Sequence, residues 1–276
     1  MLVKSDAYSV LEKTSRTFFI PIMQLPGELR DSVAASYLCM RAIDEIEDHP
    51  AWDPTRRAEL LRALSETMQT PFEPSDITAL LEPFASELDE VVLRLAEWLT
   101  LAPQNIAPRI WDATAAMADR MASWAENDFT IHTKADLDRY TYSVAGAVGL
   151  LLADLWNWHV GVVTQRPGSV AFGRGLQAVN ILRNRREDLE RGADFFPAGW
   201  KTTDMHRYAA RNLAQADLYI QDIPRGPIHN FCAIPLTLAR NTLSALADGR
   251  PGLTRSDVIG IVAALAQSQP PGIRHG

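Results

Sequence analysis

The stretch Gln177-Ala-Val-Asn-Ile-Leu-Arg-Asn-Arg-Arg-Glu-Asp188, in the second half of the chain, has the periodicity of a helix. Asn180, Asn184 and Asp188 recur at every fourth position, so their side chains stack along one face, with Gln177 a turn earlier. Carboxylate and amide oxygens repeated in this way suit a hard divalent cation, chiefly magnesium. A solvated polar face would show the same spacing, so this helix alone leaves both interpretations open.

A second oxygen-bearing helix is predicted far upstream, over residues 36–48. Its spacing places Tyr37, Arg41, Asp44 and Asp48 on one stripe. If the two helices face each other, metal ions can lie between their carboxylates, with arginines placed for phosphate oxygens. A network of surface ion pairs is the alternative. Each stripe is weak evidence by itself, and the two together favour a shared site.

Composition limits the classes of partner. The 276 residues are 47% hydrophobic and 22% charged, with a formal net charge of −7, which argues against a nucleic-acid partner. An anionic substrate would therefore need local arginines. Cys39 and Cys232 lie far apart and read as buried thiols of a reducing compartment. No apolar signal segment opens the chain, and the apolar run 144–153 is too short to span a bilayer. We expect a cytoplasmic protein, which an apolar substrate could bring to a membrane surface for product release.

Nearly the whole chain has helical periodicity, without a strand pattern, a fixed repeat or a linker. Thr133 and Asp136 form a variant capping box at one predicted helix start. The prediction is one all-α domain spanning residues 1–276, with a flexible tail from about 268. Its helices are expected at 4–13, 26–48, 52–68, 75–82, 84–101, 107–126, 133–160, 169–190, 204–220, 228–247 and 255–267.

Two stretches of small residues have more than one interpretation. Residues 173–178 match the dinucleotide fingerprint G-x-G-x-x-[GA], but that motif needs a preceding strand, so we reject it here. The glycines instead indicate close helix packing or room for a ligand. In residues 140–149, Gly and Ala along a helix indicate either helix contact or the wall of a channel for a hydrocarbon.

The six histidines form no H-x-x-x-H pair, and a zinc site is not expected.

Five ordered blocks resemble the squalene/phytoene synthase family of head-to-head prenyl transferases, and the squalene synthase branch in particular. The resemblance runs from about residue 15 to about residue 243. It lies in Ser15-Arg-Thr-Phe18, Tyr37 to Asp48, Tyr140-Thr-Tyr-Ser-Val-Ala-Gly-Ala-Val-Gly149, Gln177 to Asp188 followed by Phe195-Phe-Pro197, and Asn230-Phe-Cys-Ala-Ile-Pro235.

The resemblance implies a helical bundle of the isoprenoid synthase type with a central apolar cavity. It also implies magnesium-dependent condensation of two prenyl diphosphates, farnesyl diphosphate above all, through a cyclopropyl diphosphate to squalene or a related C30 product. NADPH is a possible reductant for the last step. The residues it implies for the metal ions are Asp44, Asp48, Asn184 and Asp188. Those it implies for catalysis and substrate contact are Ser15, Arg16, Phe18, Tyr37, Arg41, Tyr140, Val144, Ala145, Gln177, Asn180 and Arg183.

One position departs from the family pattern. Asn184 stands where the second motif has its first aspartate, and an amide oxygen can ligate magnesium but brings no negative charge. The outcomes left open are a synthase with an altered metal site, one that performs only one half-reaction, or a relative diverted to other chemistry. The competing functions are a single-substrate terpene cyclase, a prenyl diphosphate phosphatase, and a degenerate paralogue that only binds prenyl diphosphates. Substrate chain length and oligomeric state stay open.

Overall fold

The computed structural model describes residues 2–15, 18–190 and 192–267, and within these ranges the regular structure is entirely helical. The predicted flexible tail from about 268 lies outside the described residues. The helices are α1 (Leu2–Thr14), α2 (Phe19–Met23), α3 (Gly27–Glu47), α4 (Pro54–Met68), α5 (Pro74–Leu81), η1 (Glu82–Phe84), α6 (Glu90–Leu93), α7 (Leu95–Leu99), α8 (Ala107–Glu126), α9 (Lys134–Thr141), η2 (Tyr142–Gly146), α10 (Ala147–Val160), α11 (Arg166–Glu190), α12 (Thr202–Gln221), α13 (Pro227–Ala247) and α14 (Arg255–Gln267).

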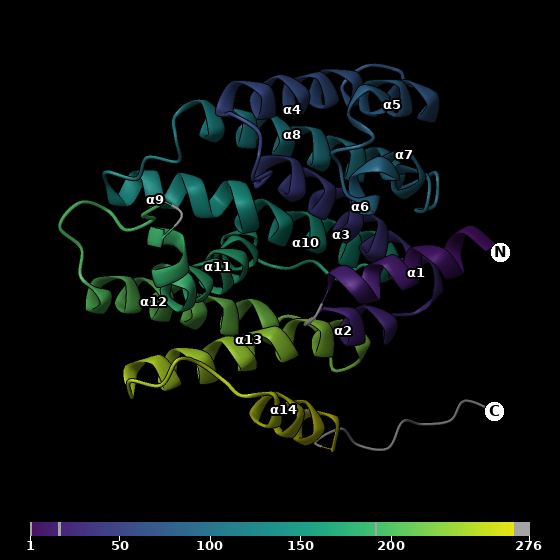
Figure 1. Ribbon diagram of the computed structural model, residues 1–276. Helices are drawn as coiled ribbons and strands as arrows, with labels where there is room; N and C mark the ends of the chain where they lie inside the picture. The colour runs from purple at the N-terminus through teal and green to yellow at the C-terminus, as the bar shows by residue number, and fades with distance from the viewer. Residues whose placement is uncertain (1, 16–17, 191, 268–276) are drawn as a thin grey trace, which may run out of the picture.

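The helices pack around α11 and α3. Helices α4 and α8 lie side by side at the top of Figure 1, with α5 and α7 beside them. Helix α11 packs against α10, α12 and α13, and α3 packs against α8 and α10. Helix α14 lies along α13 at the lower edge of Figure 1. The two helices that carry the predicted oxygen stripes are therefore both inner elements of the bundle.

Besides shifts of one or two residues at several helix ends and the short α2 and η1, which were not predicted, three differences have a local explanation. The expected helix 133–160 is interrupted by η2, a π-helical turn, which continuous apolar periodicity does not reveal. The expected helix 84–101 is two short helices, α6 and α7, because Arg94 takes φ −99° and ψ 16° between them. That break lets the buried Trp98 indole donate to the carbonyl of Val91 at 2.8 Å. Helix α11 begins at Arg166 rather than 169, because Pro167 suits a first turn.

The capping prediction at α9 is confirmed. The Thr133 hydroxyl accepts a hydrogen bond from the Asp136 amide at 3.2 Å, and the Asp136 carboxylate accepts from the Thr133 amide at 2.7 Å. These reciprocal bonds satisfy donors that the first helical turn leaves unpaired. The start of α9 is thereby fixed, six residues before Tyr140.

The glycines of α11 allow close helix packing, as predicted. Residues 173–178 lie inside α11, so the rejection of a dinucleotide fingerprint is confirmed. A β-carbon added at Gly175 would come to 2.7 Å from the side chain of Leu213 on α12. One added at Gly149 on α10 would come to 2.0 Å from the carbonyl oxygen of Ser169 on α11. At Gly149 the neighbour is backbone, so no side chain larger than hydrogen fits there, whereas at Gly175 the Leu213 side chain would have to move.

The two cysteines are buried free thiols, as expected. Burial raises the pKa of the Cys232 thiol to about 12, so it stays protonated near neutral pH. Across the helices that the structure describes, we find no segment whose length and hydropathy would let it cross a lipid bilayer.

Candidate active site

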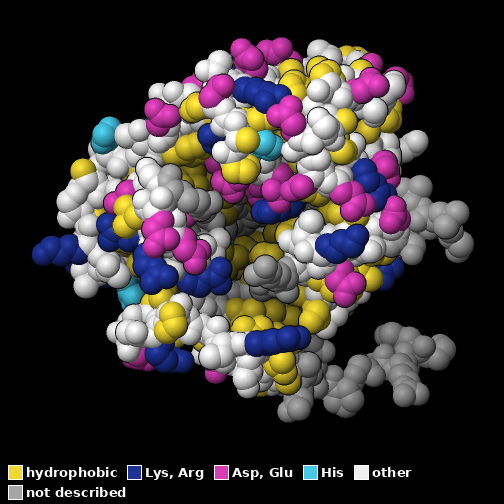
Figure 2. Space-filling model, viewed as in Figure 1, with side chains coloured by type: hydrophobic (Ala, Val, Ile, Leu, Met, Phe, Trp, Pro, Cys, Tyr) yellow, Lys and Arg dark blue, Asp and Glu magenta, His cyan; other side chains and the backbone are white. Residues whose placement is uncertain are grey.

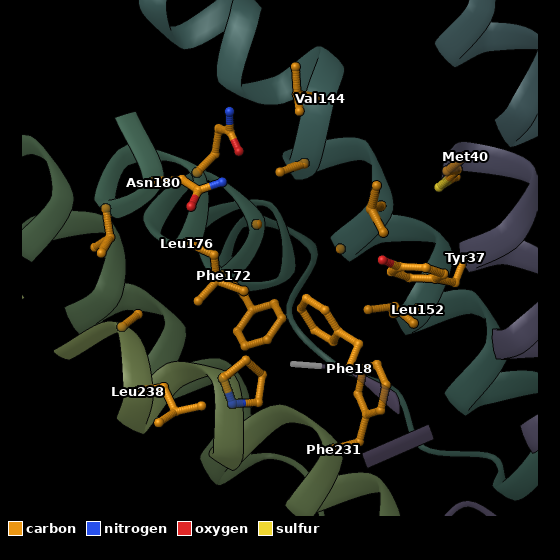
Figure 3. A pocket seen from close by; sticks show the side chains of 18 of the residues that line it. Phe18, Tyr37, Met40, Val144, Leu152, Phe172, Leu176, Asn180, Phe231 and Leu238 are labelled. Atoms are coloured by element: carbon orange, nitrogen blue, oxygen red, sulfur yellow. The ribbon is translucent and has the colours of Figure 1, made fainter. Parts of the chain in front are cut away.

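A cavity of about 410 Å³ opens between α3, η2, α10, α11 and α13, where the sequence predicts an apolar chamber. Figure 2 shows it as a hollow with a hydrophobic interior and with acidic and basic side chains at its upper rim. In Figure 3 the rings of Phe18, Phe172 and Phe231 gather at one end, and Asn180 lies toward the other. The cavity therefore has an apolar end and a polar mouth.

Aromatic side chains form the apolar end. The Phe18 ring centroid lies 6.3 Å from that of Tyr37 and 6.0 Å from that of Phe231. The Tyr37 hydroxyl donates to the Thr14 carbonyl at 3.0 Å, which leaves its ring against the cavity. Ser15 is buried and does not line the cavity, and its hydroxyl accepts from the Phe18 amide at 3.2 Å. Ser15 thus positions Phe18.

The predicted substrate residues Val144, Ala145, Gln177 and Asn180 all line the cavity. Val144 and Ala145 belong to the π-helical turn η2, and Gln177 and Asn180 belong to α11. A π-helical turn widens the helix locally and often occurs at functional sites. Arg16, also predicted to contact substrate, lies outside the described residues.

The two predicted stripes face one cavity. Asp44 on α3 and Asn180 on α11 both line it. Tyr140 is buried nearby: burial raises the pKa of its phenol well above the usual value, and the negative charges of Glu47, Asp48, Asp44 and Asp188 raise that pKa further. That the acidic groups of the two stripes hold a shared cluster of metal ions stays a prediction.

The three predicted aspartates differ in environment. Asp44 lines the cavity, and burial, together with the charges of Asp48 and Glu45, raises its pKa to about 7 although Arg41 lowers it. Asp48 caps the end of α3 and is exposed. Asp188 is buried, with 6% of its surface exposed. A divalent cation beside Asp44 would favour the ionised form of this carboxyl group and offset the repulsion from Asp48.

The arginines divide into two groups. Arg41 and Arg183 line the cavity; Arg41 pairs with Glu45, and Arg183 donates from Nε to the Asn184 side-chain oxygen at 3.1 Å. Arg185 lies over the Phe196 ring, 3.6 Å from its centroid, and pairs with an aspartate in the following loop. Only Arg41 and Arg183 of this set are therefore placed at the polar mouth.

The donor set fits magnesium held jointly with a substrate. Within residues 2–15, 18–190 and 192–267 no three His, Cys, Asp or Glu side chains converge on one point. Magnesium commonly takes one or two carboxylates and completes its shell with phosphate oxygens and water. Carboxylates spread over two facing helices suit that mode better than a closed protein cage.

Comparison with known proteins agrees with this geometry. A model of the squalene/phytoene synthase family matches residues 11–207. The chain belongs to the squalene/phytoene synthase family. Squalene synthase of Schizosaccharomyces pombe is 28% identical, in an alignment that covers 87% of this chain and 58% of that protein. Squalene synthase of Eremothecium gossypii is 30% identical, in an alignment that covers 91% of this chain and 64% of that protein.

The chain spans less than two thirds of the length of these curated relatives. The solved complex of TcSQS with the ligand BPH1237 has a TM-score of 0.74 to this structure at 22% identity, covering 96% of this chain and 86% of that one. This likeness confirms the predicted all-α fold of the isoprenoid synthase type.

Several residues of the site escaped the sequence prediction. Phe195 stacks on Tyr140, with ring centroids 4.7 Å apart and planes inclined by 15°. Trp124 meets the same tyrosine edge-on at 5.5 Å. Phe195 belongs to one of the blocks that resemble the family, but no feature of the sequence indicates that it contacts Tyr140. Further cavity residues come from α13 and the segment after it: Phe231, Pro235, Leu238, Ala239, Thr242, Leu253 and Val258.

Proposed function

We propose that this protein condenses two prenyl diphosphates head to head in a magnesium-dependent reaction. The observation that carries the proposal is a largely apolar cavity of about 410 Å³ whose wall joins Arg41 and Asp44 of α3 to Asn180 and Arg183 of α11. A charged and polar mouth joined to a hydrocarbon-lined chamber suits an amphiphile with a diphosphate head and an isoprenoid tail. Farnesyl diphosphate is the proposed substrate.

Asp44, Asp48 and Asp188 would hold the magnesium ions, with Asn184 as a weaker ligand. The bound ions would neutralise the charge that develops on the departing diphosphate. The Asn184 oxygen already accepts a hydrogen bond from Arg183, which leaves one lone pair for a metal. Arg183 and Arg41 would bind diphosphate oxygens, because guanidinium groups match their geometry.

The apolar chamber would hold the prenyl chains and keep water away from the allylic cation. The faces of Phe18 and Tyr37 border this space and would stabilise positive charge through their ring quadrupoles. Attack by the double bond of the second substrate would give a cyclopropyl diphosphate. A second ionisation, with NADPH as the proposed reductant, would give squalene or a related C30 hydrocarbon.

The experiment is mass spectrometry of the products formed from farnesyl diphosphate and magnesium, with and without NADPH. Products with a doubled carbon count are expected, and chelation of magnesium should abolish them. The proposal fails if neither farnesyl nor geranylgeranyl diphosphate gives magnesium-dependent release of diphosphate. The matched control is the same chain carrying Asp188→Asn.

Asn184 favours a second candidate, in which only one half-reaction proceeds. Its uncharged side chain removes one negative charge from the α11 wall, so an ion there would bind more weakly than beside an aspartate. Such a protein would either ionise one allylic diphosphate and release a cyclic hydrocarbon or an alcohol, or couple two substrates and stop at the cyclopropyl diphosphate. Product analysis separates these outcomes, because the first products keep the carbon count of one substrate, and the cyclopropyl product has twice that count but retains a diphosphate.

A further inference from the structure

The segment that follows α13 supplies part of the cavity wall. Leu253 and Val258 both line the cavity, and they lie well beyond residue 207, where the match to the family model ends. Helix α14 packs along α13 at the lower edge of the bundle (Figure 1). The wall on this side is therefore built by a part of the chain to which no role has yet been given.

Helix α14 has an inner and an outer face. Val258, Val262 and Leu265 follow a helical stripe at i, i+4 and i+7, and all three are partly buried. Ile259 lies on the other side and is 60% exposed. Two neighbouring aliphatic residues on one helix, Val258 and Ile259, thus differ in whether they border the cavity.

Two features hold the segment in place. Thr254 and Asp257 cap α14 reciprocally: the Thr254 amide donates to the Asp257 carboxylate at 2.8 Å, and the Asp257 amide donates to the Thr254 hydroxyl at 3.2 Å. Just before them, Gly252 has φ +137°, a conformation that favours glycine. A β-carbon at Gly252 would lie 3.6 Å from Cδ of Arg183, so the backbone there runs against that arginine.

We propose that Leu253 and Val258 determine product specificity by excluding water from the cation, an inference that rests on the function proposed above. Ionisation breaks the allylic C–O bond, and diphosphate leaves with the electron pair. The cation then accepts the π electrons of the second substrate, forming a C–C bond and losing a proton. If water reaches it first, a C–O bond forms, a proton is released, and the product is a prenyl alcohol.

The cavity wall that Leu253 and Val258 form determines whether the cation reacts with the second substrate or with water. Leu253 and Val258 present only aliphatic carbon to the cavity, so they offer water no hydrogen-bond partner on that side. The packing of Gly252 on Arg183 links the same segment to a residue at the polar mouth. A polar side chain at position 253 or 258 would offer a hydrogen-bond partner and so allow a water molecule to bind in the cavity, within reach of the cation.

The test compares Val258→Ser and Leu253→Ser with Ile259→Ser, which introduces the same hydroxyl on the outer face of α14. Labelled farnesyl diphosphate is supplied with magnesium, and the ratio of prenyl alcohol to coupled product is measured beside total diphosphate release. Val258→Ser and Leu253→Ser are expected to raise the ratio several-fold at similar diphosphate release. Ile259→Ser should leave it unchanged.

Circular dichroism checks that each variant folds. Leu253 lies before α14, so Leu253→Ser still tests the proposal if Val258→Ser does not fold. The inference is overturned if Leu253→Ser and Val258→Ser give the ratio seen with Ile259→Ser while diphosphate release persists. Absence of diphosphate release from the unsubstituted protein would instead overturn the proposed function, and this inference with it.

Discussion

The backbone of Gly173 on α11 lies directly against the carbonyl of Ala145 in the π-helical turn η2. A β-carbon at position 173 would come to 2.0 Å from that carbonyl oxygen. Both residues line the cavity, so this contact fixes the distance between two of its walls. The polar residues of α11 that follow, among them Asn180 and Asp188, take their positions from the same helix.

Gly173→Ala is expected to destabilise the fold by about 1–3 kcal/mol, because the methyl group must push α11 away from η2. Urea denaturation followed by circular dichroism measures the loss. Gly260→Ala is the matched control, since Gly260 is also helical and has no atom within 4 Å of an added β-carbon. There the same change should stabilise the helix by about 0.5–1 kcal/mol. Equal effects of the two substitutions would contradict the packing argument.

Asn184→Asp is expected to lower the magnesium concentration required for half-maximal diphosphate release by several-fold. The new carboxylate adds a negative charge on the wall that carries Asp188, and magnesium prefers charged oxygen ligands. Magnesium titration of the initial rate provides the measurement. Asn241→Asp, at an exposed position of α13, adds the same charge away from the mouth and should leave the titration unchanged. If both variants lower the half-maximal magnesium concentration equally, the change in net charge explains the result, and the position of Asn184 does not.

The stripes and the all-α fold were predictable from the sequence because they rest on local spacing, and the family was predictable because five sequence blocks resemble its motifs. Asp44 and Asp48 repeat at i and i+4 on α3, and Asn184 and Asp188 do so on α11. For the glycines of α11 the sequence left open close helix packing or room for a ligand, and Gly173 both packs closely on η2 and lines the cavity. The family and the all-α fold are confirmed, whereas the roles of the individual site residues stay predictions.

Other parts of the site depend on packing between distant segments. The π-helical turn that places Val144 and Ala145 interrupts a stretch whose apolar periodicity is continuous. The stacking of Phe195 on Tyr140 joins a loop after α11 to α9, and no spacing rule relates the two positions. Leu253 and Val258 reach the cavity only because α14 folds back along α13. Contacts of this kind are set by tertiary structure rather than by sequence pattern.

Glu87→Gln is expected to lower stability near pH 7 and to lose its effect in acid. The Glu87 carboxylate accepts two hydrogen bonds from Arg56 and one from the Trp52 indole. The Arg56 hydrogen bonds chiefly, with that of Trp52, lower its pKa from 4.5 to about 2. A depressed folded-state pKa stabilises the protein above the unfolded value, and this contribution is lost as pH falls through the folded one.

The measurement is the urea midpoint of the variant and the unsubstituted protein at about pH 7 and about pH 3. The difference in urea midpoint between the variant and the unsubstituted protein should be smaller at the lower pH. Glu59→Gln removes an equal charge from an exposed position on α4 and serves as the control. A difference that stays constant with pH would show that the lost contacts are independent of Glu87 ionisation.

Asp188→Asn is expected to slow diphosphate release by about 10²–10³-fold, because it removes a charge that would hold the metal beside the leaving group. The Asp188 carboxylate is buried, so solvent ions screen its charge little. Fixed-time assays at saturating magnesium give the rate of diphosphate release, and circular dichroism checks that the variant folds. Glu190→Gln changes an exposed carboxylate two residues further along and should retain full activity. A comparable loss in both variants would mean that the general acidity of α11, rather than the placement of Asp188, drives the reaction.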